Sequence, residues 1–394
     1  MQGAQLCCHT EKMLLKMPLN TENLIACRLC GKTSTPVSKS LGFCVDCIRY
    51  EFDSIKTTIY QSHLAARVRH RLPAEPPSSA KGIACHLCSN ECRLAKGQRS
   101  YCGVRLNIEN KFAGATPDGG NLSWYYDPLP TNCVADWVCP GGTGAGYPNF
   151  AYSPEPEYGY KNLAVFYHGC SFDCLFCQNW HHRIMATKNI RVSPDDLVAA
   201  VDDRTACICY FGGDPTPQLP HALRTSKLAR SKNSNRILRI CWETNGSMHP
   251  ALLRQIIAIS IESGGCIKFD LKAWNENVHI ALCAASNKRT LENFAIAAEH
   301  FHQRPTPPLI VASTLLIPGY IDEEEISNIA KFIASLSPDI PYTLLAFHPD
   351  FLMSDLPTTP LHQAKQCLEA ALGAGLRRVR LGNLHLLGGN WQLD

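Results

Sequence analysis

A short run of cysteines, Cys170-Ser171-Phe172-Asp173-Cys174-Leu175-Phe176-Cys177, constrains this chain of 394 residues more than any other feature. It follows an apolar, strand-like run from Leu163 to Tyr167. Three thiolates with the spacing CxxxCxxC can hold three irons of a cubane iron–sulfur cluster, and the fourth iron is then left to bind an exchangeable molecule. The alternative is a zinc site whose fourth ligand would be one of three nearby histidines, His168, His181 or His182.

The bulk composition is that of an ordinary globular protein, with 45% hydrophobic and 18% charged residues. A net charge of +4 without a long basic run does not indicate a nucleic-acid partner. No apolar run reaches about 18 residues, so we expect no membrane span. Met1 to Leu19 lacks a continuous apolar core, so we expect no signal peptide there. The 21 cysteines lie mostly in CxxC-type clusters, which predicts metal binding in a reducing compartment, the cytoplasm.

Two cysteine knuckles near the N-terminus predict a tetrahedral metal site. They are Cys27-Arg28-Leu29-Cys30 and Cys44-Val45-Asp46-Cys47. Each CxxC turn aims two thiolates at one point, and two such turns complete a zinc-ribbon or rubredoxin-like module. Zinc is the default metal, although tetrahedral sulfur also suits a single iron. Its expected role is structural, because so short a segment cannot fold on its own apolar core.

A second group of four thiols follows a predicted helix, 51–71, and a proline-rich linker, 73–79. The four are Cys85, Cys88, Cys92 and Cys102. They could hold structural zinc, a single iron or an auxiliary iron–sulfur cluster, and the sequence does not choose between these. Beyond them, 127–146 is a Pro- and Gly-rich stretch containing Cys133 and Cys139, either a loop over an active site or a connector with inert thiols.

From Leu163 onward, strand and helix signals alternate. We expect strands near 163–168, 206–211, 237–243, 265–271, 309–316 and 341–347. Repeated βα units predict a parallel sheet. The predicted segments are a flexible N-terminus (1–22), the ribbon module (23–50), helix and linker (51–80), the second cysteine module with its loop (81–160), a barrel (161–385) and a tail (386–394).

The cysteine run, with an aromatic residue before its third Cys, resembles the cluster loop of the radical S-adenosylmethionine (SAM) superfamily, in its pyruvate formate-lyase-activase-like branch. The block ending Cys102-Gly103-Val104-Arg105 is similar to one in the proteins called AmmeMemoRadiSam. The resemblance covers roughly residues 80 to 385. It implies a partial (βα)6 barrel open on one side, a [4Fe–4S] cluster on Cys170, Cys174 and Cys177, and SAM bound at the open iron.

The resemblance also assigns SAM-binding roles to residues at strand ends, where such barrels carry their working groups. Gly212, Gly213 and Asp214 correspond to a GGE motif that binds the SAM amino group, with Asp replacing Glu. Asp270 would contact the ribose or a cation, and Lys272 the SAM carboxylate. Further expected contacts lie in the strand-end segments around 243 and 348. They are Glu243, Thr244 and His348.

Three functions are compatible with these features. The leading one is a radical SAM enzyme that generates a 5′-deoxyadenosyl radical and abstracts hydrogen from a polypeptide, with flavodoxin or ferredoxin as electron donor. The second is a cobalamin-dependent radical SAM C-methyltransferase acting on a protein, although no DxHxxG-type cobalamin signature is present. The third is a non-catalytic iron–sulfur or zinc sensor or adaptor.

Overall fold

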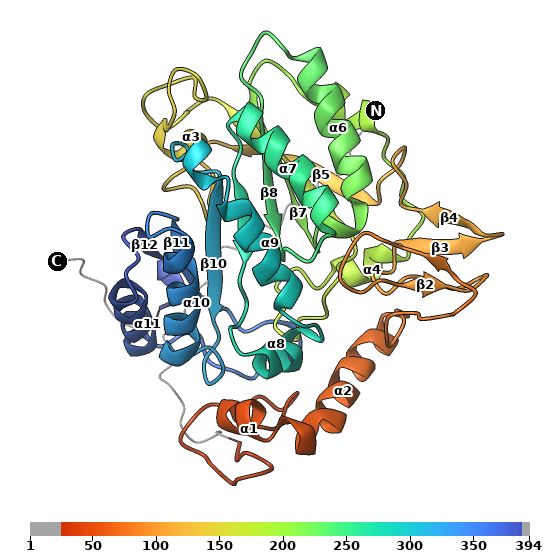
Figure 1. Cartoon of the computed structure of the whole chain (residues 1–394), viewed down its shortest axis with the longest axis vertical. Coiled ribbons are helices and arrows are strands. Elements are labelled where there is room, and N and C mark those ends of the chain that lie inside the picture. Colours follow the sequence, from red (N-terminus) through yellow and green to blue (C-terminus); the bar gives the residue numbers. More distant parts are fainter. Residues whose placement is uncertain (1–24, 388–394) are drawn as a thin grey trace, which may run out of the picture.

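The computed structural model describes residues 25–387 (Figure 1). The inferences about 1–22 and about Met1 to Leu19 fall outside the described residues, as does most of the tail, 386–394.

An eight-stranded sheet forms the centre of the molecule, in the order β12-β11-β10-β9-β8-β7-β6-β5. All neighbouring pairs are parallel except β5 and β6. The strands are β5 Leu122–Pro128, β6 Lys161–Tyr167, β7 Thr205–Gly212, β8 Arg239–Thr244, β9 Ile267–Asp270, β10 Ile310–Leu316, β11 Tyr342–Ala346 and β12 Val379–Gly382. Since β5 and β12 are the two ends of this order, the barrel is partial.

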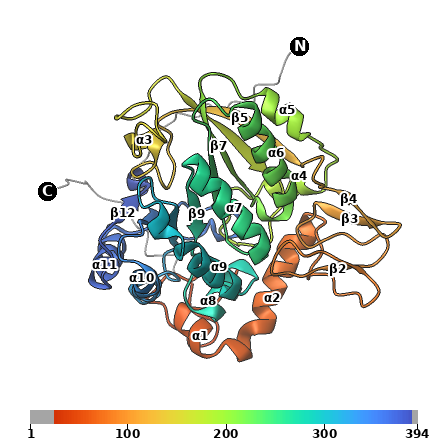
Figure 2. The same cartoon turned by 45° about the horizontal axis from the view of Figure 1, so that its top comes forward.

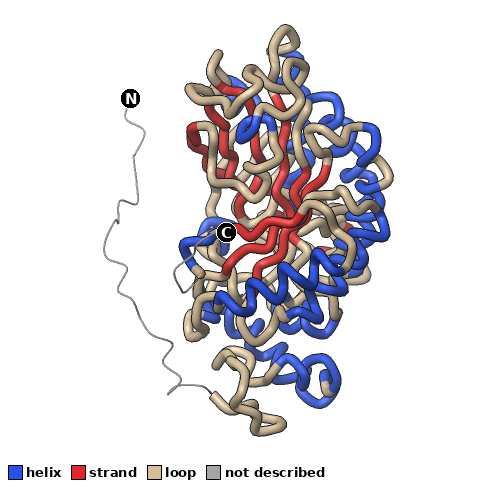
Figure 3. The backbone as a smooth tube through the Cα atoms, turned by 90° about the vertical axis from the view of Figure 1, so that its left-hand side faces the viewer, coloured by secondary structure: helices blue, strands red, loops and turns tan. Residues whose placement is uncertain are grey.

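Helices connect the strands and gather mostly along one side of the sheet, while loops occupy much of the other side (Figure 3). The barrel helices are α4 His182–Ala186, α5 Pro194–Ala199, α6 Leu219–Lys232, α7 Pro250–Ser263, α8 Glu276–Cys283, α9 Lys288–Ala298, α10 Glu323–Leu336 and α11 Leu361–Gly373. Short 3-10 turns cover Thr216–Gln218, Phe301–Gln303, Phe351–Met353 and Leu384–Leu386. Among the described residues, no helix is long and apolar enough to cross a membrane.

The N-terminal segment carries α1 Val45–Tyr50 and α2 Phe52–Arg69 and lies along the outside of the barrel (Figure 2). Two small antiparallel hairpins follow. One pairs β1 Ile83–Ala84 with β2 Arg93–Leu94, and the other pairs β3 Arg105–Ile108 with β4 Lys111–Gly114. A short helix, α3 Pro140–Thr143, lies in the segment between β5 and β6.

The predicted fold class is confirmed: this is an α/β protein with a mainly parallel sheet and an N-terminal cysteine cluster. All six expected strands are present within a few residues of their predicted bounds. The strands β5 and β12 of the central sheet were not predicted from the sequence. The prediction of an irregular stretch from Asp127 is wrong at its start, because Asp127 and Pro128 still pair with β6. β5 has four successive exposed residues, so it lacks the apolar run by which buried strands are recognised.

Candidate active site

One open cavity collects most of the predicted site residues at the carboxyl ends of the parallel strands. Its walls come from the cluster loop and from the ends of β7, β8, β9 and β10. The predicted residues that line it are Cys170, Cys174, Cys177, Gly212, Gly213, Asp214, Glu243, Thr244, Asp270 and Lys272. Parallel strands present their carboxyl ends at one edge, so motifs up to about a hundred positions apart meet there.

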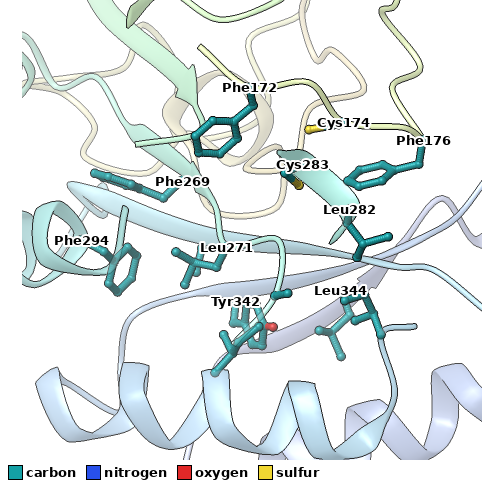
Figure 4. Packing of buried hydrophobic residues seen from close by; sticks show 14 of the residues in the cluster. Phe172, Cys174, Phe176, Phe269, Leu271, Leu282, Cys283, Phe294, Tyr342 and Leu344 are labelled. Atoms are coloured by element: carbon teal, nitrogen blue, oxygen red, sulfur yellow. The ribbon is translucent and has the colours of Figure 1, made fainter. Parts of the chain in front are cut away.

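The cluster loop is held in place by the C-terminal turn of α8. The backbone N–H of Asp173 donates to the carbonyl of Cys283 (2.9 Å), and that of Leu175 donates to the carbonyl of Leu282 (3.0 Å). Phe172 and Phe176 are buried on either side of these contacts (Figure 4). The loop is therefore fixed by the helix carbonyls, and its cysteine side chains remain available to the cavity.

A buried charge cluster supports the loop from behind. The Asp173 carboxylate is fully buried and contacts three cationic or basic side chains. Its oxygens lie 3.0 Å from His63 Nδ1, 3.3 Å from Arg183 Nε and 3.4 Å from Arg67 Nη1. Burial alone would raise the pKa of Asp173, but the His63 hydrogen bond and the charges of Arg183 and Arg67 outweigh it and lower the pKa to about 2. The carboxylate is therefore ionised.

The three loop cysteines are neutral thiols at pH 7 when no metal is bound. Burial raises the pKa of Cys170 and Cys177, and the neighbouring Cys283 thiol together with burial raises that of Cys174. Binding of iron would displace these protons. No three of these thiols and nearby histidines lie as close together as the ligands of a single ion within residues 25–387, so the spacing does not favour the zinc alternative.

Gly212 and Gly213 allow two backbone segments to approach closely beside the cavity. A Cβ at Gly212 would lie 2.5 Å from the carbonyl oxygen of Tyr167, and one at Gly213 would lie 2.3 Å from that of Gly169. Gly212 also has a φ of +119°, which side chains other than glycine rarely adopt. The glycines are thus required for the end of β7 to pack against the segment that leads into the cluster loop.

Asp214 binds the end of the neighbouring strand. Its carboxylate accepts hydrogen bonds from the backbone N–H groups of Asn245 (2.7 Å) and Thr216 (2.8 Å) and from the Thr244 hydroxyl (3.1 Å). Burial raises its pKa, and these donors oppose that shift. Although Asp214 lines the cavity, three protein donors already occupy its carboxylate.

Lys272 and Asp270 form an ion pair at the end of β9, with Nζ 3.0 Å from Oδ2. Ser313, on the adjacent strand β10, donates its hydroxyl to the other Asp270 oxygen (2.8 Å). Burial acts to lower the pKa of Lys272, yet the Asp270 charge and nearby thiols raise it overall, so the ammonium is charged at pH 7. A partly exposed cation and a carboxylate therefore face the same cavity.

His348 does not reach this cavity. Its side chain is 52% exposed, its Nδ1 lies 3.0 Å from Asp350, and it is absent from the cavity walls. On this side Leu345 of β11 lines the cavity, so the structure does not bring His348 together with the other predicted SAM contacts.

The ribbon cysteines form a close tetrad. The sulfur atoms of Cys27, Cys30, Cys44 and Cys47 all lie within 4.8 Å of one another. The Cys27–Cys47 and Cys30–Cys44 sulfur distances are 3.7 and 3.8 Å. A tetrahedron of thiolates about 2.3 Å from a central ion has edges of about 3.8 Å. The tetrad therefore fits one zinc or iron ion.

The second predicted group differs from the ribbon. Cys85 and Cys92 belong to one small apolar cluster and Cys102 to another. Burial and the neighbouring sulfurs raise the pKa of Cys88, Cys92 and Cys102. No three of them approach one another as closely as the ribbon thiols do within the described chain. The loop between Cys88 and Cys92 touches the cluster loop, where Asn90 Nδ2 donates to the Ser171 carbonyl (2.7 Å).

Several residues of the cavity were not predicted from the sequence. Asn245 donates to the Ser171 hydroxyl (2.9 Å) and lies 3.6 Å from the Cys170 sulfur, while Ser313 and Thr314 line the wall from β10. All three are polar residues at or near the end of a buried strand, and that position was the available signal. Arg183 also lines the cavity, and nothing in its local sequence distinguishes it from a solvated arginine.

Comparison with known proteins finds a family match for the part of the chain that forms the barrel. Residues 164–333 match the radical SAM superfamily. This stretch of the chain is therefore similar to the radical SAM superfamily, and the chain also resembles proteins named as activating enzymes.

Two relatives differ in how much of the two chains the similarity covers. The chain is 25% identical to an uncharacterized protein of Methanocaldococcus jannaschii over 77% of this chain and 81% of the relative. It is 32% identical to the isethionate sulfite-lyase activating enzyme of Desulfovibrio desulfuricans over 35% of this chain, and the match spans only 40% of that enzyme. A crystal structure of a domain of pyruvate-formate lyase-activating enzyme from Bacteroides vulgatus aligns with 44% of this chain and 98% of that domain, at 22% identity and a TM-score of 0.36. Likeness at that score is too weak to support a functional conclusion.

Proposed function

We propose that this radical SAM protein uses a [4Fe–4S] cluster on Cys170, Cys174 and Cys177 to cleave SAM and abstract hydrogen from a polypeptide. One observation carries the proposal: the three thiols share a cavity with the polar ends of adjacent parallel strands. A zwitterionic ligand with a ribose needs anchors for a carboxylate, an ammonium and hydroxyl groups. Lys272, Asp270 and the hydroxyls of Ser313 and Thr314 offer groups of those kinds.

When bound, the cluster would supply the electron that cleaves SAM to methionine and a 5′-deoxyadenosyl radical, which then takes hydrogen from the substrate. The chain's own part is to bind and orient SAM. We assign the SAM carboxylate to Lys272 and the ribose hydroxyls to Asp270. Phe172, Phe176 and Leu315 provide apolar wall that excludes water beside the reacting groups.

The polypeptide substrate is proposed from the relatives. One of them is named for activating another enzyme, isethionate sulfite-lyase, and an activating enzyme acts on a protein. A flavodoxin or ferredoxin would be the electron donor. The described cysteines are all unpaired, which suits a reducing compartment such as the cytoplasm. Nothing in residues 25–387 favours the cobalamin hypothesis or the non-catalytic one.

The first test is SAM cleavage by anaerobically reconstituted protein with dithionite. The wild-type chain should release 5′-deoxyadenosine, and the triple variant C170A/C174A/C177A should release none. Cys367→Ala, which removes a buried thiol in α11, is the matched control and should retain cleavage. Cleavage by the triple variant would contradict the cluster assignment.

The second test concerns the substrate class. An extract of cells grown in deuterated medium is separated into macromolecules and small molecules, and each fraction is added to the enzyme with unlabelled SAM. Deuterium should enter 5′-deoxyadenosine from the macromolecular fraction, and protease treatment should abolish the transfer. Transfer from the small-molecule fraction alone would reject a polypeptide substrate.

A further inference from the structure

A second cavity lies inside the barrel and adjoins the first, with which it shares Phe211 and Glu243 as wall residues. It encloses about 720 Å³, including its open mouth. Its walls are the inward-facing residues of β5 to β9 and the loop after β5. Six cysteines line it: Cys133, Cys139, Cys207, Cys209, Cys241 and Cys266. This concentration is selective, since only Cys283 and Cys367 among the 19 described cysteines lie outside this cavity, the ribbon, the second cysteine group and the cluster loop.

Three of the six thiols form a row across adjacent strands. Cys209 on β7 lies directly beside Cys241 on β8 in the parallel register. Trp242 pairs with Ile267, so the preceding residues, Cys241 and Cys266, are also neighbours. Adjacent strands are about 4.8 Å apart, and same-register side chains point to the same face. The row is therefore a consequence of register and is fixed by the sheet.

The other three thiols come from β7 itself and from the loop that covers the cavity. Cys207 lies two positions before Cys209, on the same face of β7. Cys133 and Cys139 belong to the loop after β5, which is tied to the far side of the barrel. There, Asp136 pairs with Arg380 (2.6 Å), and Trp137 Nε1 donates to the Thr343 hydroxyl (3.1 Å). The loop thus holds two thiols over the strand thiols.

A buried cation lies among the sulfurs. Lys268 Nζ is 3.0 Å from Cys133 Sγ, 3.3 Å from Cys209 Sγ and 2.8 Å from Glu243 Oε1, and its side chain is 4% exposed. Burial raises the pKa of Cys133 and Cys209 overall, and the Lys268 charge opposes that shift. The ammonium therefore reduces the cost of forming the thiolate, which is the form that binds metal. This second cavity is called the chamber below. If the chamber only packed apolar groups, it would not need a buried lysine in contact with two sulfurs.

The spacing indicates the kind of centre. Within residues 25–387 only the ribbon has three or more ligands within 4.8 Å of one another, so the chamber is not preformed for a single ion. The cluster loop does not meet that spacing either. Thiolates that bind different irons of one cluster are farther apart than thiolates on one ion, and thiolate donors select soft metals and iron–sulfur clusters.

We propose that this chamber binds a second, polynuclear iron–sulfur cluster, held by the row Cys209, Cys241 and Cys266 with a further thiolate from Cys133, Cys139 or Cys207. Each ligating thiol loses its proton on binding. Lys268 acts as a positioning residue that offsets the charge of the thiolates. The proposal concerns a different site from the cluster loop and holds whatever the substrate is.

The test uses the full chain in the background C170A/C174A/C177A, in which the cluster loop contributes no iron. After anaerobic reconstitution with ferrous iron and sulfide, acid-labile sulfide per chain is measured. Sulfide is the informative quantity, because a single iron in the ribbon binds none. Adding C209S/C241S should remove about two to four sulfides per chain, the content of one [2Fe–2S] or [4Fe–4S] cluster. Any cluster on Cys85, Cys88, Cys92 and Cys102 contributes equally to both proteins.

Cys367→Ser in the same background is the matched control and should leave the sulfide content unchanged. Far-UV circular dichroism checks that each variant is folded. A second pair, C241A/C266A, repeats the measurement if serine at 209 prevents folding, and it should cause the same loss. Equal sulfide content in the background protein and in either folded pair variant would overturn the proposal. The proposal would also be overturned if substitution of Cys85 and Cys88 removed all the sulfide of the background protein.

Discussion

Lys272 is the residue whose charge matters most to the proposed SAM site. Its ammonium is mostly buried and has one carboxylate partner, Asp270. A charge-assisted contact to the SAM carboxylate is generally worth about 1.5–3 kcal/mol. Lys272→Ala should therefore weaken SAM binding by roughly one to two decades, since 1.4 kcal/mol is tenfold. Titration of SAM into the reconstituted protein, followed by the cluster's spectrum, measures this.

Asp270→Asn is the matched change on the other half of the pair. It keeps the shape of the side chain and releases Lys272, so SAM affinity should fall much less than in Lys272→Ala. Both variants should still assemble the cluster, because neither residue is a proposed iron ligand. Equal affinities in Lys272→Ala and the wild type would remove Lys272 from the site.

His221 predicts a pH dependence of stability. It is buried in α6 with Nδ1 2.7 Å from the Tyr167 hydroxyl, and burial lowers its pKa from 6.5 to about 4. Between pH 6.5 and 4 the unfolded chain binds a proton here that the folded chain does not. The contribution of neutral His221 to the free energy of unfolding is therefore complete above pH 6.5. It is lost as the pH falls toward 4. When the pH is lowered from 7 to 5, the free energy of unfolding of the wild type should fall by about 2 kcal/mol more than that of His221→Gln. Urea unfolding at the two pH values measures this. Parallel losses in both proteins would contradict this.

At the scale of elements, the ribbon is attached to the barrel through α1 and the N-terminus of α10. Arg49, only 3% exposed, contacts Asp322 (2.6 Å), Glu324 (3.1 Å) and Glu325 (3.1 Å). Acidic residues at the start of a helix complement its dipole. The structure adds that the same carboxylates bind the ribbon.

Arg49→Ala should lower the free energy of unfolding by about 3–5 kcal/mol, because Glu325 would remain buried without its cation. Chemical denaturation measures the change. Lys56→Ala is the control, since its pair with Asp53 is exposed and such pairs contribute about 0–1 kcal/mol. If the contacts of Arg49 with α10 do not stabilise the protein, the two variants should have similar free energies of unfolding.

At the scale of the whole molecule, α2 connects the N-terminal modules to the cluster loop. Arg67 contacts Asp173 behind the loop (3.4 Å) and donates to the carbonyls of Pro73 and Tyr101. Arg67→Ala should therefore destabilise the protein by about 3–5 kcal/mol and reduce the iron retained after reconstitution. Arg69→Ala changes an exposed arginine on the same helix and should stay within about 0.5 kcal/mol of the wild type. Unchanged iron retention and stability in Arg67→Ala would show that α2 is not needed to hold the loop.

The sequence by itself determined the features that depend on local patterns. The six apolar strand runs and their alternation with helices were sufficient for the α/β class, and the two CxxC knuckles were sufficient for a four-cysteine metal site. The predicted strand ends also located most of the cavity residues, because the carboxyl ends of parallel strands all lie at the same edge of the sheet.

Only the tertiary structure decided the features that depend on contacts between distant segments. It showed that Gly212 and Gly213 pack against the segment before the cluster loop, that Asp214 binds the end of β8, and that His348 lies outside the cavity. It also brought three strand cysteines, Cys266 directly before β9, and two loop cysteines to one chamber. Single cysteines in separate strands carry no local signal, since their proximity arises from strand register, and register is set by the packing of the whole sheet.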